Sequence, residues 1–152
     1  MVMKYVHTNI IAKDWKKLSK FYQEVFGCVP VPPERNLRGV WLDKMTGISG
    51  AHITGEHLCL PGYEIDHPTL EIFSYDNLED GGKPLINRTG FGHIAFEVDN
   101  VQETLNTLLV AGGGQAGELI FADYPNNIQA TIVYATDIEG NIVELQSWEK
   151  KK

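Results

Sequence analysis

Two histidines and two glutamates of the chain have the chemistry of metal ligands and recur at matching places. His7 and His93 each lie in a stretch of alternating residues, and Glu71 and Glu144 each lie in a later one. Imidazole nitrogen and carboxylate oxygen together suit a divalent transition metal ion, here Zn, Ni, Co, Mn or Fe. A lone histidine at a strand start is more often a surface or packed residue, so the recurrence in both halves is what favours a site.

Each histidine lies on a predicted strand that is followed by a predicted helix. Residues 5–12 alternate as a strand does, and Asp14 is placed to cap a helix that ends at Gly27. The same order returns at residues 91–98, with Asn100 or Asp99 as the next cap candidate. The two halves of the chain therefore begin with the same strand-helix unit.

The spacing and the closing strands indicate an internal repeat. His7 and Gly27 are 20 residues apart, and so are His93 and Gly113. Each half ends in a strand around its glutamate, and both of these strands read Glu-x-x-Ser-aromatic. Each half also has room for two more short β segments. The sequence predicts an α+β fold of two tandem βαβββ modules.

The first half is longer than the second by 13 residues between its histidine and its glutamate. We place this surplus within residues 30–49, where apolar residues predict a short helix with an apolar face. Such a helix forms either a lid or wall over a site, or a surface element packed on the core. The residues of that predicted face are Val40, Trp41, Met45 and Ile48.

Strand alternation predicts that all four candidate ligands lie on the sheet face that carries no helix. The apolar residues that flank them suit packing beneath the helices. If the two modules pair their curved sheets, the helix-free faces enclose a cleft with two imidazoles and two carboxylates. The other histidines have no counterpart in the repeat: His67 is expected in a loop, and His57 is expected to be structural or to support a ligand.

Composition bounds the class of protein. A chain of 152 residues is one domain's length, with module one at about 1–76, a linker at about 77–89 and module two at about 90–149. The net charge of −7 disfavours nucleic acid and anionic membranes as partners. Two cysteines, no long apolar run and no signal-peptide core predict a cytoplasmic protein without a disulfide scaffold.

Several stretches resemble the vicinal oxygen chelate superfamily, which includes glyoxalase I, extradiol dioxygenases, methylmalonyl-CoA epimerase and bleomycin- and fosfomycin-resistance proteins. The resemblance lies in His7-Thr8 with Asp14, in residues 21–27, in 92–99, and in the Asp-x-x-Gly-x-x-x-Glu-Leu pattern of 137–145. It covers nearly the whole chain. It implies paired βαβββ modules whose curved mixed sheets enclose a metal cleft.

By this resemblance, His7, Glu71, His93 and Glu144 match the four metal-ligand positions, and the set is most like that of glyoxalase I. The implied activity is that of a metal-dependent lyase or isomerase, in which the metal ion chelates two oxygens on adjacent carbons of a small substrate and an enediolate forms. Glu144 is the expected general base, with Glu71 as its mirror. The resemblance also implies a homodimer.

Other reactions of the superfamily remain open. The alternatives are an isomerase like methylmalonyl-CoA epimerase, an extradiol dioxygenase, and a metal-retaining protein that binds or inactivates a small molecule. Epimerases commonly have Gln where Glu71 stands, and dioxygenases use two histidines and one carboxylate. Glutathione dependence would need cations near the site, for which Arg35 and Arg38 are the candidates. Four residues share the face of the glutamates and are expected either to line a pocket with aromatic walls or to pack as ordinary core: Phe73, Tyr75, Gln146 and Trp148.

Overall fold

The computed structural model describes residues 1–152, which divide into two compact units, Met1–Asp80 and Gly81–Lys152. Each unit consists of a curved mixed sheet and few helices, so the α+β fold with βαβββ modules is confirmed. None of the three helices has the length and apolar character that crossing a bilayer requires.

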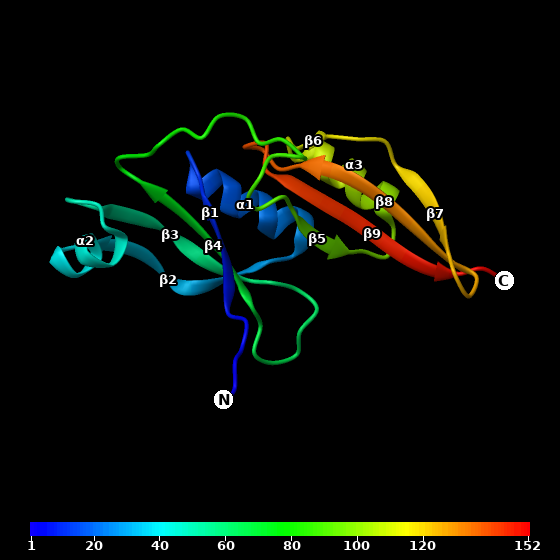
Figure 1. Ribbon diagram of the computed structural model, residues 1–152, viewed down its shortest axis with the longest axis horizontal. Coiled ribbons are helices and arrows are strands. Elements are labelled where there is room, and N and C mark those ends of the chain that lie inside the picture. The colour runs from blue at the N-terminus through cyan, green and yellow to red at the C-terminus, as the bar shows by residue number, and fades with distance from the viewer. The chain divides into compact units, whose positions relative to one another are not determined.

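The first unit is a four-stranded sheet in the order β1-β4-β3-β2 (Figure 1). β1 runs parallel to β4, and the other neighbours are antiparallel. The elements in chain order are β1 (His7–Ile11), α1 (Trp15–Phe26), β2 (Val29–Arg38), α2 (Val40–Thr46), β3 (His52–Cys59) and β4 (Thr69–Tyr75).

The second unit is a five-stranded sheet in the order β5-β9-β8-β6, with β7 also paired to β8. β5 runs parallel to β9, as β1 does to β4, so the parallel pair of first and last strands recurs. The elements are β5 (Ile94–Glu97), α3 (Val101–Val110), β6 (Gly114–Gln115), β7 (Ile120–Tyr124), β8 (Ile128–Thr136) and β9 (Ile142–Lys150).

Both long helices begin at the predicted caps. The Asp14 carboxylate accepts the backbone N–H of Lys17 at 3.1 Å, and α1 ends at Gly27 in the left-handed conformation, with φ of 67°. The Asn100 side chain accepts the backbone N–H of Glu103 at 3.0 Å at the start of α3. These caps fix where each strand-helix unit turns.

Helix α1 covers one face of the first sheet and leaves the other face free of it. Its residues Leu18 and Tyr22 are fully buried. The Ser19 hydroxyl, also buried, donates to the carboxylate of Glu56, and Glu56 is paired across the sheet with Ile72. Directly paired residues share a sheet face, so α1 lies over the Ile72 side of β4.

The structure confirms one expectation for the surplus segment and corrects another. The predicted short helix is present as α2 in the connection from β2 to β3, after a first part that is mostly strand β2. That helix, α2, buries Leu42 and leaves Val40, Trp41 and Met45 exposed, so the predicted apolar face was wrong. A helix of seven residues has too few turns for its periodicity to identify the buried side.

Helix α2 packs on the sheet face opposite to α1. Leu42 lies in one apolar cluster with Ala51, Ile53 and Phe73. Phe73 is on the opposite side of β4 from Ile72, because successive strand residues alternate. The helix is oriented by Asp43, whose carboxylate accepts the backbone N–H of Gly50 at 2.8 Å and that of Ala51 at 2.9 Å.

The two cysteines lie in the first unit as free thiols. Burial raises the pKa of the Cys28 thiol to about 12, and the neighbouring Cys59 acts in the same direction. Cys28 therefore stays protonated and poorly reactive at neutral pH.

The turn between β8 and β9 is organised by a buried carboxylate. Asp137 is only 2% exposed, and it accepts the backbone N–H groups of Glu139 at 2.9 Å and of Asn141 at 3.0 Å. It also accepts the Asn141 side-chain amide at 2.8 Å. This turn sets where β9 begins, and with it the position of Glu144.

Replacing Asp137 tests this organising role. Asp137→Ala leaves two partly buried backbone N–H groups and a side-chain amide without their acceptor, so the free energy of unfolding is expected to fall by about 2–3 kcal/mol. Urea unfolding followed by circular dichroism measures the change. Asp99→Ala, which removes an exposed carboxylate of the same unit, is the control and is expected to change it by less than about 0.5 kcal/mol. Equal losses for both variants would contradict the assignment.

Candidate metal centre

The first unit brings two histidines and a glutamate into direct contact. Nε2 of His7 lies 2.9 Å from Oε1 of Glu71, and Nε2 of His57 lies 2.8 Å from Oε2 of the same carboxylate. The Asn9 amide donates to Oε1 at 3.5 Å. Glu71 is 8% exposed, and both of its oxygens have partners. We call His7, Asn9, His57 and Glu71 the first half-site.

The strand register explains why these residues meet. β4 lies between β1 and β3, and Glu71 is directly paired with Asn9 on one side and His57 on the other. Its neighbours Leu70 and Ile72 are fully buried on the α1 side. Alternation therefore places the Glu71 side chain on the face away from α1.

The second unit forms a simpler half-site, composed of His93 and Glu144. Nε2 of His93 lies 2.9 Å from Oε2 of Glu144. Glu144 is directly paired with Ala95 on β5 and with Tyr134 on β8. The Tyr134 ring meets the His93 ring edge-on, with centroids 5.0 Å apart.

The two half-sites differ at equivalent positions of the repeat. Ala95 stands where the first unit has Asn9, and Tyr134 stands where it has His57. As a result Glu71 has three side-chain partners, whereas Glu144 has one ion-pair partner, His93.

His57 is held in its neutral form by its surroundings. Burial lowers its pKa below the ordinary value of 6.5, and the charges of Arg35 and His7 lower it further, against the opposing effect of the Glu71 carboxylate. Because a carboxylate only accepts hydrogen bonds, the neutral imidazole contacts Glu71 through a protonated Nε2.

The donor atoms of each half-site fit a divalent metal ion. Each pair offers one imidazole nitrogen and one carboxylate oxygen 2.9 Å apart. Two donor atoms that bind one metal ion at right angles, each ~2.1 Å from the ion, lie about 3.0 Å from one another. No three His, Cys, Asp or Glu side chains of the chain are arranged in the structure to hold an ion among them. The four-ligand set of both half-sites together therefore stays a prediction.

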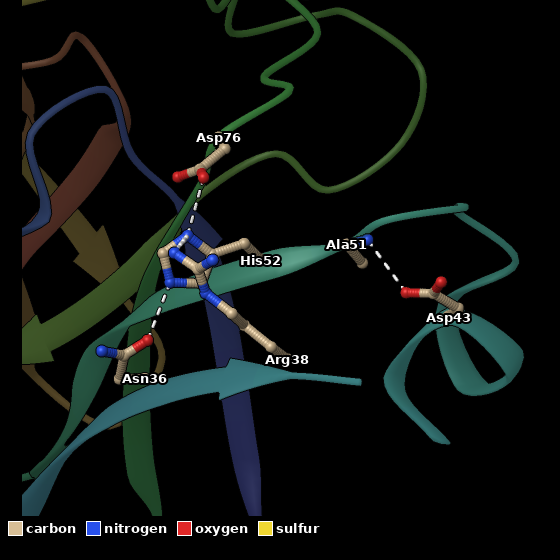
Figure 2. Close-up of polar contacts among 6 residues, drawn as sticks. All are labelled: Asn36, Arg38, Asp43, Ala51, His52 and Asp76. Atoms are coloured by element: carbon tan, nitrogen blue, oxygen red, sulfur yellow. Dashed lines mark hydrogen bonds and ion pairs between the residues drawn. The ribbon is translucent and has the colours of Figure 1, made fainter. Parts of the chain in front are cut away.

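A second polar cluster lies on the other face of the first sheet, and it accounts for His52 (Figure 2). The His52 ring lies between Asp76, 2.7 Å from Nδ1, and Asn36, 2.7 Å from Nε2. Arg38 is 3.2 Å from Nδ1. His52 and His57 are five positions apart along β3, so their side chains lie on opposite faces of the sheet. His52 therefore lies on the α1 side, separate from the first half-site.

The same alternation separates the two arginines considered for acidic substrates. Arg38 is paired with His52 and shares the α1 face. Arg35 is paired with Gly55, which is itself paired with Phe73, so Arg35 lies on the face of Glu71. His67 lies in the loop before β4, as expected, and its Nδ1 contacts the Leu60 carbonyl at 2.8 Å.

Comparison with known proteins places the chain in a family. Residues 4–145 match the model of the Glyoxalase/Bleomycin resistance protein/Dioxygenase superfamily, and the chain belongs to this superfamily. The predicted resemblance is thereby confirmed at the level of the superfamily, while the closer likeness to glyoxalase I stays a prediction. No curated protein matches the sequence.

Solved structures of the same fold cover nearly all of the chain. A glyoxalase family protein from Bacillus cereus has a TM-score of 0.73 at 19% identity, over 96% of this chain and 93% of that one. The fosfomycin resistance protein FosX from Listeria monocytogenes, complexed with Mn(II) and 1S,2S-dihydroxypropylphosphonic acid, has a TM-score of 0.57 at 17% identity, over 95% and 92%. A glyoxalase/bleomycin resistance protein/dioxygenase family enzyme from Burkholderia phytofirmans has a TM-score of 0.54 at 15% identity, over 93% of this chain and 95% of that one.

Sequence reasoning left the role of His57 open and did not find Asn9 or Tyr134 at all. A signal for His57 was its position directly before the apolar Leu58, which turns the two side chains to opposite faces of a strand. That alternation places it on the face of the glutamate only once the pairing of the two strands is known. Asn9 and Tyr134 carry no such signal, because their contact with a glutamate is set entirely by register.

The lowered pKa of His57 predicts a pH dependence of stability in the metal-free protein. Between the ordinary value of 6.5 and the lowered value the unfolded chain binds more protons than the folded one. The contribution of neutral His57 to the free energy of unfolding is therefore complete above pH 6.5, and it is lost as the pH falls through this window. NMR titration of the imidazole nitrogens should find the pKa of His57 below 6.5, and a pKa at or above that value would contradict the assignment.

Proposed function

We propose that this chain is a metal-dependent isomerase or lyase of the glyoxalase type, which moves a proton between two adjacent carbons of a small substrate that carries oxygen on both. Membership of the superfamily and the imidazole–carboxylate pair in each repeat support this proposal. The observation that carries it is the unequal support of the two carboxylates, since Glu144 has one side-chain partner and Glu71 has three.

His7, Glu71, His93 and Glu144 are the residues that would hold the metal ion. When bound, a divalent metal ion in such a site acts as a Lewis acid and stabilises the negative charge that develops on the substrate oxygens. The protein's own task is then to orient the substrate and to carry the proton.

Glu144 is the group proposed to carry the proton. Its one side-chain partner is His93, so its carboxylate can turn toward a substrate carbon more readily than that of Glu71, which has three side-chain partners. Its side chain is 15% exposed, which keeps most water away from the carboxylate. Glu144 takes a proton from one carbon and returns it to the adjacent carbon, so the substrate and the product have the same atoms and no oxidant or reductant is consumed.

The predicted aromatic walls are only partly available to a substrate. Phe73 and Tyr75 pack with α2 in the Leu42 cluster. Trp148 stacks at a tilt on Tyr124, with centroids 4.9 Å apart, and its indole N–H donates to Gln146 at 2.7 Å. These contacts are ordinary packing at one end of each sheet, so a substrate would meet mainly the polar half-sites.

Arg35 favours a second candidate, which is the conversion of a small anion. Its guanidinium belongs to the same sheet face as Glu71, and its charge is felt by His57. The FosX protein was crystallised with Mn(II) and a phosphonic acid, which is an anion of this kind. For this chain, a phosphonate or carboxylate beside the metal ligands would be paired with Arg35.

Replacing Glu144 tests the proposed reaction. The metal-loaded protein is assayed for proton exchange with solvent on α-ketoaldehyde–thiol adducts and acyl-CoA thioesters. The anionic alternative is assayed separately, as the addition of water to the epoxide of fosfomycin, which gives a diol. Glu144→Gln is expected to lower kcat by about 100-fold or more, because general-base catalysis is worth 10²–10⁴-fold. Metal content, measured by mass spectrometry of the same samples, is expected to be retained.

Glu149→Gln, on the opposite face of β9, is the matched control and is expected to leave turnover unchanged. Full turnover by metal-loaded Glu144→Gln would contradict the role of Glu144. Turnover of fosfomycin alone would favour the second candidate over the first.

A further inference from the structure

The two units differ at the position directly opposite the last-strand glutamate on its antiparallel neighbour, which is β3 in the first unit and β8 in the second. In the second unit this position is Tyr134, whose ring packs against His93. In the first unit it is His57, whose Nε2 contacts Oε2 of Glu71 at 2.8 Å. The first unit thus has a donor to its carboxylate, His57, where the second unit has a tyrosine ring that packs on the histidine instead.

His57 is itself fixed by its surroundings. Its ring meets Phe73 edge-on, with centroids 5.6 Å apart, and lies at right angles to the His7 ring, with centroids 6.1 Å apart. Its side chain is 20% exposed, so packing leaves it little freedom to turn. A donor held in this way imposes its direction on the acceptor it contacts.

We propose that His57 is a positioning residue of the metal centre: by donating to Oε2 of Glu71, it holds the carboxylate so that Oε1 stays beside Nε2 of His7 as a fixed ligand. This inference rests on the proposed function, because it assumes that Glu71 binds a metal ion. Hydrogen-bond donors to a ligand raise metal affinity because they hold the ligand in its binding orientation before the metal ion binds.

This arrangement divides the work between two carboxylates that the repeat would otherwise make equivalent. Glu71, tied at both oxygens by His7 and His57, would stay in place as a ligand. Glu144, which has no counterpart of His57, is left to move. His57 thereby decides which of the two carboxylates is free to act as the base.

Calorimetric titration of the metal-free protein with MnCl₂ tests the proposal without reference to activity. His57→Ala is expected to weaken Mn²⁺ binding about 10- to 100-fold, the usual effect of losing a group that orients a ligand. His57→Gln, whose amide nitrogen can reach Oε2, is expected to restore affinity to within ~3-fold, and the matched control Tyr134→Phe to change it by less than ~2-fold.

A double-mutant cycle ties the effect to Glu71. In the Glu71→Ala background, His57→Ala is expected to weaken Mn²⁺ binding by less than about 2-fold further, because the carboxylate it positions is gone. If His57→Ala fails to fold, His57→Asn takes its place, since the shorter amide falls short of Oε2 and predicts the same loss.

The possible outcomes separate this proposal from the proposed function. Wild-type affinity in His57→Ala would overturn it, and so would a failure of His57→Gln to restore binding, which would make His57 a ligand itself. Either result leaves the metal-dependent reaction standing. If the wild-type chain binds no Mn²⁺, Zn²⁺ or Ni²⁺, the proposed function falls and this inference falls with it.

Discussion

Both half-sites depend on the burial of the residues that flank their glutamates. Leu70 and Ile72 on β4, and Val143 and Leu145 on β9, are each fully buried. Burying one such side chain stabilises the fold by roughly 1.5–3 kcal/mol, and a slip of one residue would turn every one of them to the other face. The apolar neighbours therefore fix the direction of each glutamate, and the histidines meet it through the parallel pairing of first and last strands.

The cost of burying a carboxylate explains the polar contacts around it. A charged group that is removed from water destabilises the fold unless hydrogen bonds or opposite charges compensate it. In the first unit three side chains supply that compensation, and Glu71 is 8% exposed. Glu144 has His93 alone and is somewhat more exposed.

The features that the sequence predicts well are those governed by local chemistry. The caps at Asp14 and Asn100, the repeat, and the alternation around the glutamates follow from neighbouring residues. β2 was missed because prolines such as Pro32 disfavour strands, yet β2 is an edge strand, where a missing N–H is tolerated. The buried side of α2 and the role of His57 depend on which strands pair, and local sequence does not determine that pairing.

We propose that the imidazole–carboxylate pairs of the two repeats bind one metal ion together, and the mechanism depends on this. Native mass spectrometry of the full chain titrated with Mn²⁺ tests it most directly, alongside His7→Ala and His93→Ala. We expect one Mn²⁺ per chain in the wild type and a loss of at least about 10-fold in affinity in either variant, because each half-site would supply part of the same coordination shell. Unchanged stoichiometry and affinity in His93→Ala would contradict it, since the first half-site would then bind the ion alone.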